Sequence, residues 1–230
     1  MQHDTHASDG PETYGVMPYI KGQRCVYFLE GGIGCGKSTV IDACPDTFAC
    51  VRENLDVWRT LNYPRLAYKS PSEHAWNFQS LVLATQQHDL ATALQTDARV
   101  IVVERSVVSN AIFAELLHED GTISDLQMGI YREQHKAASL AMNMLCHGCH
   151  VEHIWLDVSP KECLQRLTER NTMRGDKDGE SAVDHTYLQR LIEKHADVFV
   201  QTSTPLGRVT RMTNPTVDAV LQHMFFTKLQ

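Results

Sequence analysis

The sequence predicts an α/β fold in which a parallel sheet of five strands has helices on both faces. Three observations lead to this fold class. Short apolar runs alternate with longer segments of helical pattern, which is typical of strand–helix–strand units. The apolar runs contain few alternating polar residues, as expected for strands covered on both faces. A glycine-rich segment with a lysine follows the first run, where a strand would turn into a helix.

The expected elements follow one another in regular order. Strands are expected at the apolar runs 25–30, 47–51, 99–104, 151–158 and 207–213, of which 47–51 has the weakest pattern. Helices are expected at 73–97, 124–146, 160–170, 184–200 and 216–226. The hydrophilic segment 171–181 predicts a loop or lid. We expect residues 24–230 to form a single domain and the polar segment 1–23 to be a disordered tail.

Residues 31–39 carry the most specific motif of the chain. They match the pattern G-x-x-x-x-G-K-[ST] and begin directly after the apolar run 25–30. Glycines let backbone N–H groups close on phosphate oxygens, and the helix expected after Lys37 points its positive end at the same anion. Lys37 would reach the β- and γ-phosphates. The sequence therefore predicts a P-loop NTPase-type fold that binds ATP phosphates through Gly31, Gly32, Ile33, Gly34, Cys35, Gly36, Lys37, Ser38 and Thr39.

A second motif, Glu104-Arg105-Ser106, ends the apolar run 99–104. In P-loop folds, a carboxylate at this end of the sheet holds Mg²⁺ or one of its water ligands. We therefore expect Ser38 and Glu104 to bind Mg²⁺. Arg105, beside that carboxylate, is placed to contact phosphate or a substrate hydroxyl.

Several segments resemble the deoxynucleoside kinases, the family of deoxycytidine kinase and mitochondrial thymidine kinase. Glu104-Arg105-Ser106 resembles the family's Glu-Arg-Ser motif, and Glu30 also resembles the family residue before the P-loop. The segment 53–58 resembles its Glu-Pro-Val-x-x-Trp element without the proline. Tyr68-Lys-Ser-Pro71 and Phe78-Gln79 resemble elements of its nucleoside pocket. The resemblance runs from about residue 25 to the end and is loose after residue 165. Compact kinases of this type also occur in large DNA viruses.

The resemblance implies transfer of the γ-phosphoryl group of ATP to the 5′-hydroxyl of a pyrimidine deoxynucleoside. Glu53 would be the general base that takes the hydroxyl proton. Gln79 would read the base, because its amide offers a donor and an acceptor side by side. Trp58 would be a wall of the pocket, Tyr68 would bind the 3′-hydroxyl, and Phe113 would stack on the base.

The chain departs from the family pattern at positions that affect specificity. Deoxycytidine kinase has a charged arginine–aspartate pair where this chain has Gln86 and Asn110, so we expect thymidine to be accepted. The family's lid acid, which pairs with the 3′-hydroxyl, is expected at the position of Thr186. Asp184 or Glu180 could replace that acid.

Arginines enter the expected lid. Arg166 and Arg170 are one helical turn apart and would act in catalysis by neutralising charge on the transferring phosphoryl group. The family pattern is Arg-x-x-x-Arg-x-Arg. Thr172 replaces its last arginine here, and Arg174 could compensate.

Composition limits the other partners. The net charge of −7 argues against a nucleic-acid-binding surface. No apolar run approaches the roughly 20 residues needed to span a bilayer, and no export or transit pattern is present. Seven cysteines in a chain of this size indicate reduced thiols and a cytoplasmic or nuclear location. The family resemblance implies a homodimer formed through long helices.

Two alternatives share the P-loop. A nucleoside monophosphate kinase such as thymidylate kinase would need further cations for the acceptor phosphate, and usually has Asp-Arg-Tyr in place of Glu104-Arg105-Ser106. A P-loop protein could also bind nucleotide without turning it over. A guanine-nucleotide switch is not supported, because no Asn-Lys-x-Asp motif occurs in the chain.

Overall fold

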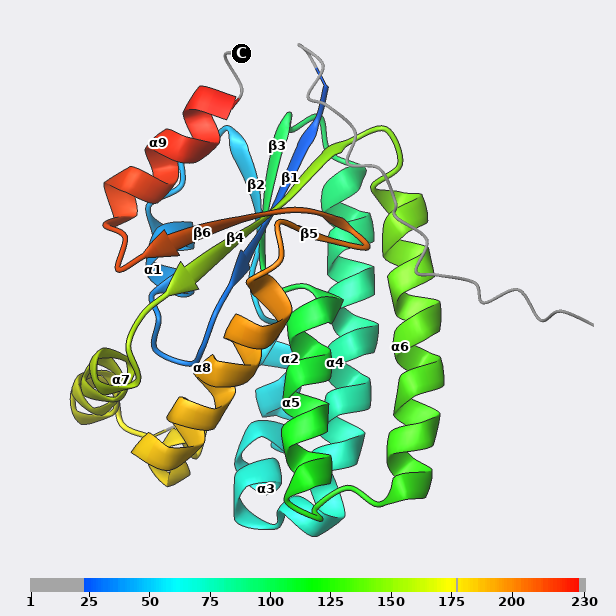
Figure 1. Ribbon diagram of the computed structural model, residues 1–230, viewed down its shortest axis with the longest axis vertical. Coiled ribbons are helices and arrows are strands. Elements are labelled where there is room, and N and C mark those ends of the chain that lie inside the picture. The colour runs from blue at the N-terminus through cyan, green and yellow to red at the C-terminus, as the bar shows by residue number, and fades with distance from the viewer. Residues whose placement is uncertain (1–22, 177, 228–230) are drawn as a thin grey trace, which may run out of the picture.

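The computed structural model describes residues 23–176 and 178–227. The segment expected to be a disordered tail lies outside these residues, except for Gln23. The described chain is an α/β fold with one central sheet (Figure 1). The strands are β1 (Cys25–Glu30), β2 (Phe48–Val51), β3 (Val100–Glu104), β4 (His150–Asp157), β5 (Ser203–Thr204) and β6 (Gly207–Thr213).

The sheet has six strands in the order β2-β3-β1-β4-β6-β5. The expected strands pair in parallel through β2, β3, β1, β4 and β6. The prediction of a five-stranded parallel sheet is wrong in one respect, because β5 adds an antiparallel edge to β6 and makes the sheet mixed. A two-residue strand is too short to produce an apolar run, so it left no signal in the sequence.

Helices cover both faces of this sheet (Figure 1). On one face lie α4 (Pro71–Leu94), α5 (Val107–Glu119) and α6 (Asp125–Leu145). The other face is covered by α1 (Lys37–Asp42) and α9 (Val217–Thr227). The remaining helices are α2 (Leu55–Thr60), α3 (Tyr63–Lys69), α7 (Pro160–Arg174), the 3₁₀ turn η1 (Glu180–Ala182) and α8 (His185–Phe199).

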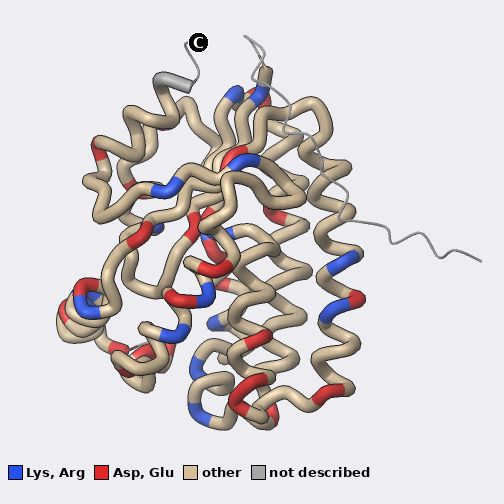
Figure 2. The backbone as a smooth tube through the Cα atoms, in the orientation of Figure 1, with Lys and Arg blue, Asp and Glu red and all other residues tan. Residues whose placement is uncertain are grey.

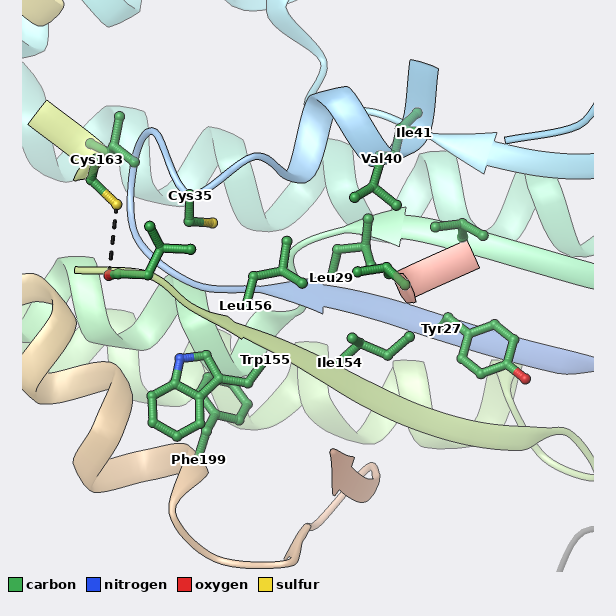
Figure 3. Packing of buried hydrophobic residues seen from close by; sticks show 14 of the residues in the cluster. Tyr27, Leu29, Cys35, Val40, Ile41, Ile154, Trp155, Leu156, Cys163 and Phe199 are labelled. Atoms are coloured by element: carbon green, nitrogen blue, oxygen red, sulfur yellow. Dashed lines mark hydrogen bonds between the residues drawn. The ribbon is translucent and has the colours of Figure 1, made fainter. Parts of the chain in front are cut away.

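Successive residues of β1 point to opposite layers of the core. Tyr27 and Leu29 belong to the cluster that includes α1 and α9, whereas Val26 and Phe28 belong to the cluster with α4, α5 and α6. All of them are fully buried. Figure 3 shows Tyr27 and Leu29 among the aliphatic side chains of the first cluster. Burial of both strand faces explains the lack of polar alternation in the sequence.

Three helices were not expected from the sequence. Helices α2 and α3 are short and are separated by Asn62, whose φ of 57° lies in the left-handed region. Helix α5 begins with two β-branched valines, a composition that also suits a strand. Its start is fixed by Ser106, whose side chain accepts a hydrogen bond from the Val108 N–H at 3.1 Å.

The segment expected to be a loop at 171–181 is helical at both ends. Helix α7 continues to Arg174, four residues beyond the expected end, and stops at Gly175 with a φ of 74°. The turn η1 then begins at Glu180. The expected helix end at residue 170 is therefore too early, and within the added turn the Thr172 hydroxyl donates to the Thr168 carbonyl at 2.8 Å.

Candidate active site

The P-loop connects β1 to α1 at the carboxyl edge of the sheet. Gly31, Gly34 and Gly36 have φ values of 130°, 82° and 105°, which non-glycine residues rarely adopt. The Lys37 ammonium group lies inside the loop and donates to the Gly32 carbonyl at 2.9 Å and to the Gly31 carbonyl at 3.3 Å. The loop therefore surrounds a buried cation, the arrangement that a triphosphate requires.

Helix α7 packs directly against the P-loop. A Cβ on Gly34 would lie 2.5 Å from the Cys163 carbonyl oxygen, so only glycine fits at this position. Figure 3 shows Cys163 close to the loop that carries Cys35. Arg166, one turn further along α7, donates to the Cys35 carbonyl at 3.2 Å. This contact brings one of the predicted lid arginines to the phosphate loop.

The two predicted Mg²⁺ ligands meet beside the P-loop. Ser38 Oγ donates to Glu104 Oε1 at 2.8 Å, and Glu104 is 7% exposed at the end of β3. Burial and then the charge of Glu53 raise the pKa of Glu104, whereas Lys37 and the Ser38 hydrogen bond act in the opposite direction. Two hard oxygen donors at this point form a suitable part of a magnesium site.

Arg105 connects the motif at the end of β3 to two other segments. Its backbone has a φ of 65°, which turns the side chain back toward the P-loop. The guanidinium donates to Glu53 Oε1 at 2.8 Å and to the Gly31 carbonyl at 2.6 Å. It also lies 4.8 Å from the centre of the Phe113 ring. The side chain of Arg105 is 7% exposed, so these contacts are well shielded from water.

Glu53 stands two residues after β2 and is bonded to Arg105 beside the P-loop. Its side chain is 29% exposed. It lines a pocket between the end of β2, helix α4 and the start of α5. The lining residues are Val51, Arg52, Glu53, Asn54, Trp58, Val82, Thr85, Gln86, Asp89, Glu104, Arg105 and Asn110. The structure thus places Glu53, Trp58, Arg105 and Asn110 around one cavity.

Gln86 and Asn110 form a neutral buried pair in this pocket. The Asn110 Nδ2 group donates to Gln86 Oε1 at 2.7 Å, and Gln86 Nε2 donates to the Arg105 carbonyl at 2.6 Å. Gln86 is 9% and Asn110 2% exposed. The chain of hydrogen bonds fixes both amides and supports the unusual backbone of Arg105. The sequence shows that both positions are neutral, but no sequence pattern predicts their hydrogen-bonded connection to Arg105.

Trp58 forms part of the pocket wall through its own packing contacts. Its indole N–H donates to Thr85 Oγ1 at 3.1 Å, and its ring meets Phe78 edge-on at 5.3 Å. Thr85 was not predicted as a site residue. Its hydroxyl also bonds within α4, and no sequence motif marks it.

The structure places Tyr68, Gln79 and Phe113 outside the lining of this pocket. Tyr68 is half-buried, and its pKa is raised by burial and by the nearby groups of Tyr187, Glu180 and Glu53. Gln79 is 8% exposed on the same face of α4 as Gln86. Phe113 packs against Arg105 and meets His195 edge-on at 6.2 Å. Their predicted contacts with a nucleoside stay predictions.

The predicted lid arginines lie in three different environments. Arg166 contacts the P-loop, as described above, and Arg170 forms an ion pair with Glu180. Arg174 is exposed at the end of α7. Thr172, which replaces the family's last arginine, is exposed and bonded within the helix. The structure therefore brings Arg166 and Arg170 toward the site and leaves Arg174 in solvent.

Glu180 is the acid of this region that pairs with the predicted lid arginine Arg170. Burial raises the pKa of Glu180, Arg170 opposes this shift, and the charges of Asp178 and Glu53 add to it. Thr186, the position expected to align with the lid acid, is exposed on α8. Asp184 caps α8 by accepting from the Tyr187 N–H at 2.8 Å. Glu180 is coupled electrostatically to Glu53 and Tyr68.

A pair of hydrogen bonds joins the lid segment to α2. Arg59 Nε and Nη2 donate to the two carboxylate oxygens of Asp178 at 2.8 and 2.7 Å. Gly179 packs against Tyr68, since a Cβ on Gly179 would lie 3.4 Å from the Tyr68 side chain. This contact could not be predicted from the sequence, because two charged residues 119 positions apart form no local pattern.

Behind the P-loop, Glu30 organises a buried polar network. Glu30 accepts from His153 Nδ1 at 2.9 Å and from the hydroxyl of Ser109. Burial alone would raise its pKa, but the hydrogen bond and charge of His153, with Ser106 and Ser109, lower the pKa of Glu30 to about 2. The network fixes the start of α5, and with it the Glu104-Arg105-Ser106 turn, against β1.

Within the part of the chain that the structure describes, no helix combines the length and the apolar character that crossing a membrane requires.

Comparison with known proteins agrees with this geometry. The family model described as deoxynucleoside kinase matches residues 27–222. A probable deoxycytidine kinase of fowlpox virus (strain NVSL) is 36% identical over 169 residues, which cover 73% of this chain and 68% of the relative. The thymidine kinase of Ictalurid herpesvirus 1 (strain Auburn) is 27% identical over 225 residues, covering 93% and 90%.

A cellular relative shows a similar level of identity. Deoxycytidine kinase 2 of Gallus gallus is 27% identical over 195 residues, which cover 73% of this chain and 71% of the relative. The family match spans the P-loop, the Glu104-Arg105-Ser106 turn and the helices that carry the predicted lid arginines. The chain therefore belongs to the deoxynucleoside kinase family and is an ATP-dependent deoxynucleoside kinase.

Proposed function

We propose that this kinase phosphorylates the 5′-hydroxyl of a pyrimidine deoxynucleoside, accepts thymidine, and uses Glu53 as its general base. The observation that carries the proposal is the position of Arg105, which bonds both Glu53 and the P-loop residue Gly31. This guanidinium holds a carboxylate at the mouth of the phosphate loop, where an acceptor hydroxyl would approach the γ-phosphate. A base in this position can remove the hydroxyl proton while the phosphoryl group is transferred.

Glu53 has the properties that such a base needs. Its side chain lines the pocket and is partly exposed, so a substrate hydroxyl can reach it. Arg105 occupies Oε1, which leaves Oε2 for the substrate proton. Glu53 thus accepts the proton at Oε2 and keeps its orientation through Oε1.

Ser38 and Glu104 would hold Mg²⁺, because they present two oxygen donors to the same point beside Lys37. Bound Mg²⁺ would neutralise charge on the triphosphate. Lys37 lies within the loop and would contact the β- and γ-phosphates. The backbone N–H groups of residues 31–39 would bind the remaining phosphate oxygens.

Arg166 and Arg170 would act on the transferring group from α7. Arg166 already contacts the loop at the Cys35 carbonyl, and Arg170 is held by Glu180. The Arg166 guanidinium can reorient toward phosphate oxygens, which bind arginine more strongly than a carbonyl does. The positive charge of both arginines would stabilise the charge that develops on the γ-phosphoryl oxygens.

The pocket would hold the nucleoside between Trp58 and the Gln86–Asn110 pair. The neutral pair offers no fixed charge, so a pyrimidine edge with either donor or acceptor pattern can be accommodated. Gln79 would read the pyrimidine edge from the same face of α4, and Phe113 would stack on the base. Tyr68 and Glu180 would bind the 3′-hydroxyl, since the two groups interact with each other and with Glu53.

Helix α6 would form the homodimer interface with a second copy of the chain. Exposed apolar side chains recur on one face of α6, with Leu126 at 75%, Ile130 at 44%, Leu140 at 62% and Met144 at 70% exposure. Figure 2 shows that the charged positions of α6 lie in its first two thirds. Leu140→Glu should yield a monomer by light scattering, whereas a dimer of unchanged mass would rule out this face.

The remaining partners follow from composition. The net charge of −7 favours small-molecule substrates over nucleic acid. The reduced cysteines favour a cytoplasmic or nuclear location. Fluorescence microscopy of the tagged chain and a binding assay with duplex DNA at low salt test these two points.

The substrate proposal is tested by steady-state turnover with ATP and Mg²⁺. The acceptors are thymidine, deoxycytidine, deoxyadenosine, deoxyguanosine and thymidine monophosphate. We expect turnover of thymidine, with or without deoxycytidine, and no turnover of the monophosphate. Turnover of purine deoxynucleosides alone would contradict the pyrimidine assignment, and turnover of the monophosphate alone would remove Glu53 from the role of base.

A further inference from the structure

A pair of cysteines lies at the edge of the sheet, outside the proposed site. Cys44 follows helix α1, and Cys50 is in β2, the edge strand. A turn between them is closed by a hydrogen bond from the Phe48 N–H to the Pro45 carbonyl at 2.9 Å. The turn folds the chain back, so two cysteines six positions apart in the sequence lie next to each other.

The two thiols contact each other, but their accessibility differs. An ion pair between Asp42 and Arg52 closes this segment outside the two cysteines, and the side chains of Cys44 and Cys50 interact with each other. Cys50 is exposed, whereas Cys44 is half-buried and its thiol also contacts the Val40 carbonyl at 3.4 Å. The other five cysteines of the chain are buried or half-buried. Small reagents therefore reach the Cys50 thiol more readily than the Cys44 thiol.

The charges around the pair favour reaction at Cys50. The thiol of Cys44 and the guanidinium of Arg52 lower the pKa of Cys50 to about 7, although burial opposes this shift. The same contact raises the pKa of Cys44. Asp42 pairs with Arg52 and keeps the guanidinium at this edge. In contrast, burial raises the pKa of Cys146 and of Cys163 to about 12. Cys50 is thus the thiol that is both accessible and substantially ionised near neutral pH.

We propose that Cys44 and Cys50 form an oxidisable dithiol, which reacts with a low-molecular-weight disulfide and closes to an intramolecular disulfide bond. In the first step, the Cys50 thiolate attacks one sulfur of the small disulfide, and one thiolate leaves. In the second step, Cys44 loses its proton to solvent and attacks the Cys50 sulfur, which releases the second thiolate. The protein gives up two electrons and its two thiol protons, and the small disulfide is reduced to two thiols.

The disulfide would connect two elements that carry the proposed catalytic groups. Helix α1 begins at Lys37, and β2 leads to Glu53 three residues after Cys50. Fixing the end of α1 to β2 restrains the segment that positions Glu53. We therefore expect a reversible loss of turnover on oxidation, a consequence that rests on the proposed function. Formation of the bond does not depend on that function.

Mass spectrometry of the full-length protein tests the dithiol. The two cysteines are the only ones in the tryptic peptide 38–52, because the nearest basic residues are Lys37 and Arg52. The reduced protein is incubated with oxidised glutathione near neutral pH, and remaining thiols are blocked with N-ethylmaleimide. We expect this peptide to lose two hydrogens and to gain neither glutathione nor maleimide. Two maleimide groups on the peptide, under conditions that add glutathione to the C44S variant, would overturn the proposal.

The two single variants establish the order of the steps. In C44S, the reaction should stop with glutathione on Cys50, because no second thiol can displace it. In C50S, Cys44 should keep its thiol over the same time. A wild-type peptide that retains glutathione, or a C50S peptide that is modified as fast as C44S, would contradict the mechanism.

Turnover is measured on the same samples. The loss of turnover in the wild type should parallel the fraction of disulfide and be reversed by dithiothreitol, whereas C50S should keep its turnover. A fully oxidised protein with unchanged turnover would overturn the link to Glu53 while leaving the disulfide itself established.

Discussion

The guanidinium of Arg105 donates to the carboxylate of Glu53 at 2.8 Å, although 52 positions separate the two residues in the chain. The same guanidinium donates to the Gly31 carbonyl at 2.6 Å. One side chain thereby ties together the end of β2, the P-loop and the end of β3. The proposed base is held relative to the phosphate loop before any substrate binds, a form of preorganisation on which catalysis depends.

The contact between the P-loop and α7 makes Gly34 essential. Gly34→Ala would place a methyl group 2.5 Å from the Cys163 carbonyl at a φ of 82°. We expect loss of ATP binding and destabilisation by about 1–3 kcal/mol, because backbone rather than a flexible side chain must move. Gly129→Ala is the control, since nothing lies within 4 Å of its Cβ. Calorimetric titration with ATP and urea unfolding measure both effects, and normal ATP affinity in Gly34→Ala would contradict the packing.

The neutral Gln86–Asn110 pair predicts how a charged pair at these two positions would change the preference between deoxycytidine and thymidine. With Gln86→Arg and Asn110→Asp together, an arginine that can only donate hydrogen bonds faces the pyrimidine. Cytosine has an acceptor at N3, whereas thymine has a donor there. We expect kcat/KM for deoxycytidine relative to thymidine to rise about tenfold, or ~1.4 kcal/mol.

The single variants are the controls for that exchange. Each leaves one buried charge without its partner, so we expect destabilisation by about 3 kcal/mol and poor turnover of both nucleosides. A stable double variant whose preference is unchanged would show that Gln86 and Asn110 do not contact the base.

The Arg59–Asp178 contact predicts an effect on nucleoside binding with little effect on stability. The Arg59 side chain is 42% exposed, so Arg59→Gln and Asp178→Asn should each change the free energy of unfolding by less than about 1 kcal/mol. Both should raise KM for the nucleoside, because the contact holds the segment with Glu180 beside Tyr68. In the double variant, the losses in kcat/KM should be less than additive. Lys136→Gln, which breaks the exposed pair with Glu133 on α6, serves as control.

His195 predicts how stability depends on pH. Its Nδ1 lies 2.7 Å from the Leu191 carbonyl, which can only accept, so Nδ1 carries the proton of a neutral ring. Burial lowers the pKa of His195 to about 3. The unfolded chain therefore binds a proton below about pH 6.5 that the folded chain excludes. Stability should fall as pH decreases below that value, by up to about 1.4 kcal/mol per pH unit.

Urea unfolding between about pH 6.5 and 5 measures this dependence of stability on pH. The interval lies above the pH range in which Glu30 would titrate. His195→Gln should reduce the slope of the free energy of unfolding against pH by an amount that corresponds to at most one bound proton. His185→Gln, at an exposed position of the same helix, should leave it unchanged. Equal slopes for the wild type and His195→Gln would contradict the assignment of a neutral buried ring.

The sequence was sufficient to predict features that depend on local pattern. Buried parallel strands, the P-loop and the Glu104-Arg105-Ser106 turn all follow from contiguous residues, and the structure contains them. The two-residue strand β5 and the short helices α2 and α3 lack a pattern long enough to detect. The antiparallel edge of the sheet therefore could not be predicted.

Contacts between residues that are far apart in the chain could not be predicted from the sequence. The link from Asn110 through Gln86 to the Arg105 carbonyl depends on how α4 packs against α5. The family's lid acid was expected at the position of Thr186, which is exposed on α8. Glu180 pairs with Arg170 instead, a contact between α7 and η1 that carries no local sequence pattern.

The most direct test of the account is single-turnover phosphorylation of thymidine by Glu53→Gln, with ATP binding measured on the same protein. Glutamine keeps the shape of the side chain but cannot take a proton. We expect normal ATP affinity and a rate reduced by about 10²–10⁴-fold, the range for loss of a general base. Glu193→Gln, at an exposed position of α8, should retain the wild-type rate. A rate for Glu53→Gln within a few-fold of the wild type would contradict the assignment of Glu53 as the base.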